Sequence, residues 1–511
     1  MLQHFQLRQT DRWLPIFFFL GLLIVGLAIF SDYGVSWDEP LQRQVGIATW
    51  DYIFGKNNDL LRNDNCYLNP FIAGFEAAPE KILQLESERD IYLSRHLFNF
   101  MFCWVGSIFF YLLALRLFHD YRLALVACLL LVLSPRQFIH SFYNSKDLPF
   151  LFLFVVNAYL LVIWIERRKW SYIWLMIIFS GMLTGARVAG VFFPLIVFLS
   201  VAVMYFSKQL SQKEIKMIFV YMLLYPVSVY VFFPTFWHDP VEEFFKAVAV
   251  MSRHPYEVTT FFMGETVHSL QTPWYYIVVW MVIIIPLGWW FFFLAGTTSL
   301  AIEIITKRRT IPIQWMIMIT WLLLPIITAI ALHSSTYDDG RHLFFIYPPF
   351  VLIAVQGFRS LLQNKIESLN RFFIPAASTL VFLITTIYII VFMIRYHPYQ
   401  YAFFNAIGRK YAADYFEKDY WGLSYRNALE FLVKYVPDGS INVNWKVDPC
   451  EWNLIWLSDH DQQRIHIVRE EGQFDYYITN YRSERPKDLS KEKIYEIKVQ
   501  GITIMAVYKM D

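Results

Sequence analysis

Long apolar runs constrain this chain more than any other feature of its sequence. A helix needs about 20 mainly apolar residues to cross a bilayer. Runs of this kind lie near residues 13–30, 97–118, 123–133, 148–165, 171–184, 188–206, 217–233, 274–298, 313–332, 343–361 and 372–394. The chain is 57% hydrophobic, whereas soluble domains are about 45–50% apolar. The sequence therefore predicts a polytopic α-helical membrane protein with about 11 transmembrane helices.

Lysine and arginine in the short connections indicate the orientation, because cytoplasmic loops carry an excess of both. If the spans alternate, one side receives Arg8, Arg12, Arg122, Arg167, Arg168, Lys169, Lys208, Lys213, Lys216, Lys307, Arg308, Arg309, Arg359, Lys365 and Arg371. We expect this side to be the cytoplasm, together with the amino terminus. Residues 1–394 would then form a membrane domain with large outer loops at 31–96 and 234–273.

Beyond residue 395 the apolar runs become short and charges become frequent, which predicts a small extracytoplasmic α/β domain over 395–511. Helical periodicity covers 425–435, and β-prone stretches follow at 441–445, 465–468, 476–479 and 501–508. Cys66 and Cys450 fall on the same outer side. A disulfide between them is possible, but their spacing does not establish one.

The sequence Trp37-Asp38-Glu39-Pro40 follows the first apolar run, at the depth of a lipid headgroup. Acidic residues at that depth are candidates for function, so Asp38 and Glu39 are the candidate catalytic residues. The alternative is that they only begin a helix, with Pro40 at its first position and negative charge near its amino end. The two roles are compatible.

A second carboxylate, Asp147, lies just before another span. Beside Asp38 it would let the site hold a divalent cation, Mg²⁺ or Mn²⁺, or would raise the pKa of one acid. The alternative is that Asp147 caps the helix that starts at Leu148. Asp147 is also a candidate substrate ligand.

Five further outer-face side chains are candidate substrate ligands: Arg95, His140, Arg187, Arg341 and His342. Arginine can bind a phosphate bidentately, which would suit a lipid phosphate. The alternative for Arg341 is an ordinary snorkelling side chain at the membrane boundary.

Several of these motifs together resemble the glycosyltransferase family 39 superfamily, a group of the membrane GT-C class that includes protein O-mannosyltransferases and lipid A aminoarabinose transferases. The motifs are Asp38-Glu39, the loop from Ser134-Pro135 to Asp147, Pro273-Trp274-Tyr275-Tyr276, and the stretch from Arg341-His342 to Pro348. His397-Pro398-Tyr399-Gln400, Phe404-Asn405 and Asp419-Tyr420-Trp421-Gly422 also resemble prokaryotic members. The resemblance covers about residues 10–360.

The resemblance implies a GT-C fold in the inner membrane of a prokaryotic cell and a polyprenyl-phosphate-linked sugar as donor. It implies that Asp38 is the general base, that Glu39 orients Asp38 or the acceptor, and that Arg341 contacts the donor phosphate. Asp147 would match the second acidic position. The acceptor hydroxyl could belong to a lipid, a glycan or a protein, although the chain lacks the MIR-type domain of eukaryotic protein mannosyltransferases. The main alternative is a transporter or flippase of lipid-linked sugars, which often shows two repeated halves that we do not find here.

Overall fold

The computed structural model describes residues 13–252, 258–307, 312–363, 370–445, 449–468, 473–482 and 491–510. Of the predicted cytoplasmic cations, Arg8, Arg12, Arg308, Arg309 and Lys365 lie outside the described residues.

The membrane domain is a bundle of apolar helices, and each of the eleven apolar runs lies in one of them or in a broken pair. By length and composition, eight segments of the described chain can cross a membrane: α5 (Glu88–Phe118), α8 (Asp147–Arg167), η2 and α10 (Val188–Phe206), α11 (Gln212–Phe232), most of α14 (Leu287–Lys307), α15 (Ile313–Ala331), η4 and α16 (Asp338–Leu362), and α17 (Asn370–Arg395). The pair α6 (Tyr121–Val132) and α7 (Pro135–Tyr143), bent by 71°, would be a ninth. The predicted count of about 11 is higher because α1 (Trp13–Ile29) and α9 (Trp170–Ala186) have only 17 residues each.

One predicted span is broken. The run at 274–298 forms two helices, α13 (Tyr276–Ile284) and α14, which meet at Pro286. Proline has no N–H to donate and clashes with the preceding turn, so it ends a helix inside an otherwise apolar run. The segment from Ser134 to Asp147, expected to be a loop, is mostly the buried helix α7.

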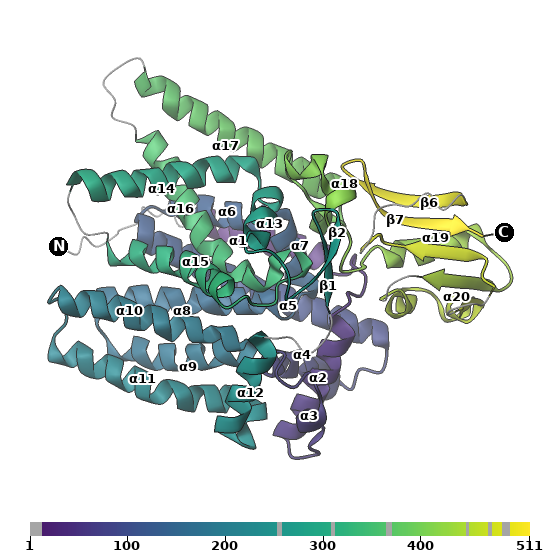
Figure 1. The fold of residues 1–511 in the computed structure, drawn as a ribbon, viewed down its shortest axis with the longest axis horizontal. Helices are drawn as coiled ribbons and strands as arrows, with labels where there is room; N and C mark the ends of the chain where they lie inside the picture. Colours follow the sequence, from purple (N-terminus) through teal and green to yellow (C-terminus); the bar gives the residue numbers. More distant parts are fainter. Residues whose placement is uncertain are drawn as a thin grey trace.

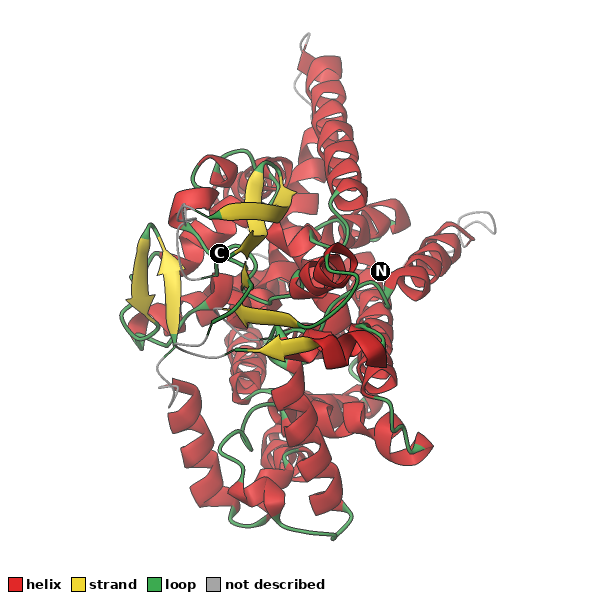
Figure 2. Cartoon of the chain, turned by 90° about the vertical axis from the view of Figure 1, so that its right-hand side faces the viewer, coloured by secondary structure: helices red, strands yellow, loops and turns green. Residues whose placement is uncertain are grey.

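Short elements gather at one end of the bundle. They are α2 (Glu39–Ile53), α3 (Asp59–Arg62), α4 (Pro70–Leu83), η3 (Pro234–Trp237), α12 (Pro240–Ser252), β1 (Thr259–Phe262) and β2 (Glu265–His268). After α17 come η5 (Gln400–Ala402), η6 (Gly408–Lys410), α18 (Ala412–Tyr415), α19 (Tyr425–Tyr435), η7 (Glu451–Trp456) and α20 (Asp459–Arg464). In Figure 1 the carboxyl-terminal sheet lies at the same end of the molecule, and in Figure 2 its strands lie in front of the helix ends.

The carboxyl-terminal sheet has five strands in the order β4-β3-β5-β7-β6. The strands are β3 (Ile441–Trp445), β4 (Ile465–Ile467), β5 (Tyr476–Thr479), β6 (Glu492–Val499) and β7 (Ile502–Lys509). β3 pairs in parallel with β4 and β5, whereas β7 pairs antiparallel with β5 and β6. The sequence analysis missed β6, whose charged residues hide its alternation. All four cysteines are buried thiols, so the possible disulfide between Cys66 and Cys450 is not formed.

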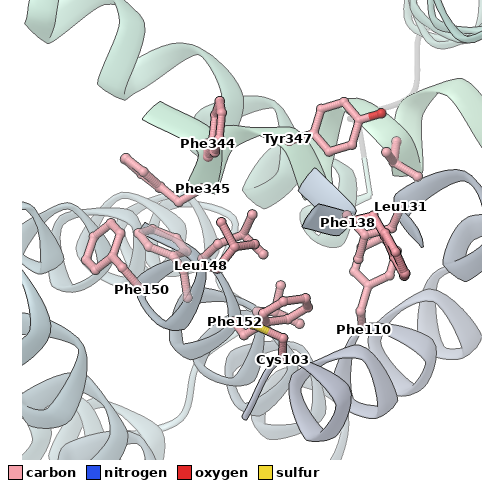
Figure 3. Packing of buried hydrophobic residues seen from close by; sticks show 14 of the residues in the cluster. Cys103, Phe110, Leu131, Phe138, Leu148, Phe150, Phe152, Phe344, Phe345 and Tyr347 are labelled. Carbon is pink, nitrogen blue, oxygen red and sulfur yellow. The ribbon is translucent and has the colours of Figure 1, made fainter. Parts of the chain in front are cut away.

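Helix α8 is the centre of the bundle, and 94% of its most apolar window is buried inside the protein. Figure 3 shows Phe150 and Phe152 of α8 packed among aromatic side chains from the helices around it. A helix that is hydrophobic all round is stable where protein or lipid surrounds it, and α8 is surrounded mainly by protein. Because Asp147 is the first residue of α8, the most enclosed helix of the bundle positions it.

Helices α14 and α16 pack so closely that glycine is required between them. A Cβ at Gly357 would collide with the carbonyl oxygen of Phe292. We expect Gly357→Val to lower the free energy of unfolding by about 1–3 kcal/mol, the usual cost of overpacking. Unfolding of the purified protein in mild detergent would measure this. Gly21→Val is the matched control, because nothing lies within 4 Å of a Cβ at Gly21. Equal stability of the two variants would contradict the prediction.

Candidate functional site

Asp38 stands at the start of α2, but its carboxylate does not cap the helix. Instead, its Oδ2 accepts Nζ of Lys146 at 2.6 Å and Nη1 of Arg341 at 2.8 Å. Both of these contacts fall on Oδ2. Asp38 therefore joins the first outer loop to two distant segments.

Glu39 holds this loop in place. Its Oε2 accepts the backbone N–H of Ser36 at 2.6 Å, and its Oε1 lies 2.8 Å from Nε2 of His96. These contacts turn the Glu39 side chain away from Arg341 and fix the backbone from which Asp38 projects.

Asp147 is bound by two arginines. Arg187 contacts Oδ1, and Nη1 of Arg341 lies 3.2 Å from Oδ2, which also accepts Nδ2 of Asn144 at 2.9 Å. The second terminal nitrogen of the Arg341 guanidinium, Nη2, lies 3.2 Å from Oδ2 of Asp338. Arg341 thus bridges Asp38, Asp147 and Asp338, and we name these four residues with Lys146 and Arg187 the ion cluster.

The charges of the ion cluster shift the pKa values of its loop members. Burial alone would raise the pKa of Asp38, but Arg341 and Lys146 outweigh it and hold that pKa well below its usual range. Burial and the neighbouring Arg341 lower the pKa of the Lys146 ammonium, while Asp38 opposes this. Asp38 is therefore a carboxylate at every pH near neutrality, but its ion pairs make it a weak base while both cations are engaged.

Two cavities lie beside η4. The first, which we call the polar cavity, is lined by Tyr67, Leu68, Asn69, Lys146, Arg187, Ser335, Tyr337 and His342. The second is mostly apolar and is lined by Ser134, Pro135, Arg136, Gln137, Ile277, Met281, Ile284, Ile285, Asp339, Gly340, Leu343, Phe344, Ile346 and Tyr347. The lining of the polar cavity contains cations and hydroxyl groups, whereas the lining of the second cavity is mainly hydrocarbon.

The carboxyl-terminal segment completes the site. The indole of Trp421 lies against Arg341, with the guanidinium carbon 4.7 Å from the ring centroid, and its Nε1 donates to Nε2 of His140 at 3.1 Å. Arg482 donates to Asp338 at 3.1 Å. The soluble domain therefore contacts both the arginine at the centre of the ion cluster and one of its carboxylates.

The structure brings Asp38, Asp147, Arg187 and Arg341 into direct contact, and it places His342 in the polar cavity beside them. Arg95 is elsewhere: it forms a buried ion pair with Glu76 at 2.5 Å. Burial raises the pKa of Glu76 to about 7, against the opposing charge of Arg95. Arg95 therefore joins α5 to α4 and does not contact the ion cluster in the described structure.

His140 also lies apart from the predicted contacts. Asn144 and Trp421 bind its two ring nitrogens, so it anchors α7 and the carboxyl-terminal segment.

Four residues of the site were not predicted: Lys146, Asp338, Trp421 and Arg482. Lys146 and Trp421 stand inside quoted motifs, and Asp338 lies three residues before Arg341. Arg482 carries no signal in the sequence, because only the fold of the soluble domain brings it to Asp338.

The residues present fit a divalent cation poorly. Nη1 of Arg341 lies between Asp38 and Asp147, and both carboxylates already bind other cations. No group of three or more metal-binding side chains occurs in the described part of the chain.

Comparison with known proteins identifies the fold. Residues 80–238 match the family model of dolichyl-phosphate-mannose-protein mannosyltransferases. The crystal structure of ArnT from Cupriavidus metallidurans in the apo state aligns with a TM-score of 0.51 and 10% identity, covering 96% of this chain and 98% of that chain. The same protein bound to undecaprenyl phosphate aligns with a TM-score of 0.50, 10% identity and coverage of 96% and 97%.

The oligosaccharyltransferase of Archaeoglobus fulgidus in the apo form aligns with a TM-score of 0.50 and 12% identity over 89% of this chain. This chain spans 65% of that longer protein. No curated protein matches the chain in sequence. The resemblance to membrane GT-C glycosyltransferases is thus confirmed, and the chain has their fold with a small carboxyl-terminal sheet.

The depressed pKa of Asp38 predicts how the stability of the site depends on pH. A carboxylate whose folded pKa is lowered stabilises the protein above its unfolded pKa, about 3.9, and this contribution is lost as pH falls through the folded pKa. We expect the difference in stability between the wild type and Asp38→Asn to stay constant from about pH 8 to 5 and to shrink only below about pH 4. Unfolding curves across pH would measure it. A difference that disappears near pH 6 would show that Asp38 is protonated there.

Proposed function

We propose that this protein is a membrane glycosyltransferase that moves a sugar from a polyprenyl phosphate to an acceptor hydroxyl on the outer face of the membrane. One observation carries the proposal: three cations, Lys146, Arg187 and Arg341, converge on two carboxylates beside a polar cavity. These cations can bind the phosphate of a lipid-linked sugar, and a carboxylate can accept the proton of the acceptor hydroxyl.

The donor phosphate would bind in the polar cavity, where Lys146 and Arg187 line the wall and Arg341 adjoins. As the bond between sugar and phosphate breaks, negative charge grows on the phosphate, and these cations stabilise it. Asp38 accepts the proton of the acceptor hydroxyl through Oδ1, and the oxygen of that hydroxyl attacks the anomeric carbon. Direct displacement of the phosphate inverts the configuration of that carbon.

The apolar cavity supports a lipid substrate, since walls such as Ile277, Met281 and Leu343 suit a hydrocarbon chain. The similar fold of ArnT, which has been crystallised with undecaprenyl phosphate, supports a polyprenyl-phosphate donor. The acceptor would be a lipid, a glycan or a protein, and the membrane would be the inner membrane of a prokaryotic cell. The mechanism uses no divalent cation, because Arg341 stands where one would bind.

Replacement of the proposed base tests the mechanism. Asp38→Asn keeps the size of the side chain but removes its basicity, so we expect transfer to fall roughly 100-fold or more while the donor still binds. The assay is transfer of a labelled sugar from polyprenyl phosphate by purified protein. Asp59→Asn is the control, because Asp59 is an exposed carboxylate in the same outer loop. Near wild-type turnover by a folded Asp38→Asn would exclude Asp38 as the base, whereas the absence of transfer by the folded wild type would favour a transporter of lipid-linked sugars.

The proposal also requires that the donor headgroup and the soluble domain share one side of the membrane. We expect reporter fusions after Lys169 and after Asp511 to lie in opposite compartments, with Lys169 in the cytoplasm. Enzymatic reporters active only in one compartment would measure this. Two cytoplasmic signals would contradict the proposal.

A further inference from the structure

Trp37, the residue before Asp38, has an exposed indole ring on a fixed backbone. Its side chain and backbone together are 41% exposed. Its backbone N–H donates to the carbonyl oxygen of Trp421 at 3.1 Å, which fixes the backbone at Trp37. A large, partly exposed aromatic side chain therefore lies one residue from the proposed base.

The ring of Trp37 faces the soluble domain. The guanidinium carbon of Arg482 lies 5.0 Å from the ring centroid, and Arg482 is in turn held by Asp338 of the ion cluster. A tryptophan of the membrane-interface belt would direct its ring toward lipid headgroups. The contact with Arg482 places Trp37 in the site instead, with one cation on its surface and the rest of its exposed area available.

Resting on the proposed function, we propose that Trp37 is a stacking platform that binds a sugar ring of the acceptor beside Oδ1 of Asp38. A pyranose has an apolar face of C–H groups and a polar rim. The π-face of an indole is apolar and electron-rich, so it matches the C–H face, while Arg482 can donate hydrogen bonds to hydroxyl groups at the rim. A rigid aromatic ring also loses little conformational entropy on binding.

This platform makes the acceptor a carbohydrate, either a free glycan or the glycan of a glycolipid. A peptide acceptor has no pyranose C–H face that could stack on the indole of Trp37. Stacking would hold the ring in one orientation, so that one of its hydroxyl groups meets Asp38.

Binding of simple sugars by the full chain in lipid nanodiscs tests the platform without any need for catalysis. The probes are the methyl glycosides of glucose, galactose, mannose and N-acetylglucosamine, followed by saturation-transfer NMR on their ring protons. We expect at least one glycoside to bind, with Trp37→Leu weakening it roughly tenfold and Trp37→Phe retaining most of the affinity. Trp274→Leu is the matched control, since Trp274 is 68% exposed on another outer segment.

Saturation with a polyprenyl-phosphate sugar distinguishes the acceptor from the donor. A glycoside signal that persists with donor bound supports an acceptor subsite, whereas a signal lost on donor binding overturns that assignment. Failure of all four glycosides to bind, or equal binding by Trp37→Leu, overturns the platform.

Transfer by the wild-type protein separates this inference from the proposed function. Glycoside binding that depends on Trp37, in a wild-type protein that transfers no labelled sugar from polyprenyl phosphate, would leave the platform standing and remove the proposed reaction.

Discussion

The site depends on the contacts of Arg341 with three carboxylates. Its guanidinium joins Asp38 at the start of α2, Asp147 at the start of α8 and Asp338 at the start of η4. These segments are far apart in the chain, and the guanidinium of Arg341 contacts all three of them. Removing one partner of a buried ion pair leaves the other uncompensated, at a cost of about 3–5 kcal/mol. Arg341 therefore has a structural role, and under the proposed function the same charge would also bind a phosphate.

Under the proposed function, Lys146 and Arg341 contact Asp38 and would also bind the donor phosphate, so donor binding would change the basicity of Asp38. Without a phosphate, Lys146 and Arg341 hold the pKa of Asp38 low, so Asp38 removes protons poorly. A donor phosphate would compete for the same cations, and every contact transferred to it would raise the basicity of Asp38. The base would then become effective when the donor is in place, which disfavours premature activation of water. The low dielectric around the buried cluster strengthens each of these effects.

Much of the fold could be predicted because apolar length decides which segments cross a bilayer. The same pattern placed Asp38, Asp147 and Arg341 at span ends on one face, which is why they could be singled out from the sequence. Their contacts could not be predicted, since Asp38 and Arg341 are 303 residues apart. The break at Pro286 was missed because hydropathy does not register a lost N–H. The pairing of Arg95 with Glu76 was missed because it depends on how α4 packs against α5, which is a tertiary property.

The carboxyl-terminal segment is part of the candidate site. Trp421 covers Arg341 with an aromatic face, and Arg482 donates a hydrogen bond to Asp338. The segment thereby shields the ion cluster without neutralising it, because an indole offers no acceptor that would replace a carboxylate or a phosphate. Under the proposed function, the cations of the ion cluster must stay buried and still exchange a carboxylate for a phosphate. An aromatic cover such as Trp421 permits this exchange because it does not bind the cations as a carboxylate does.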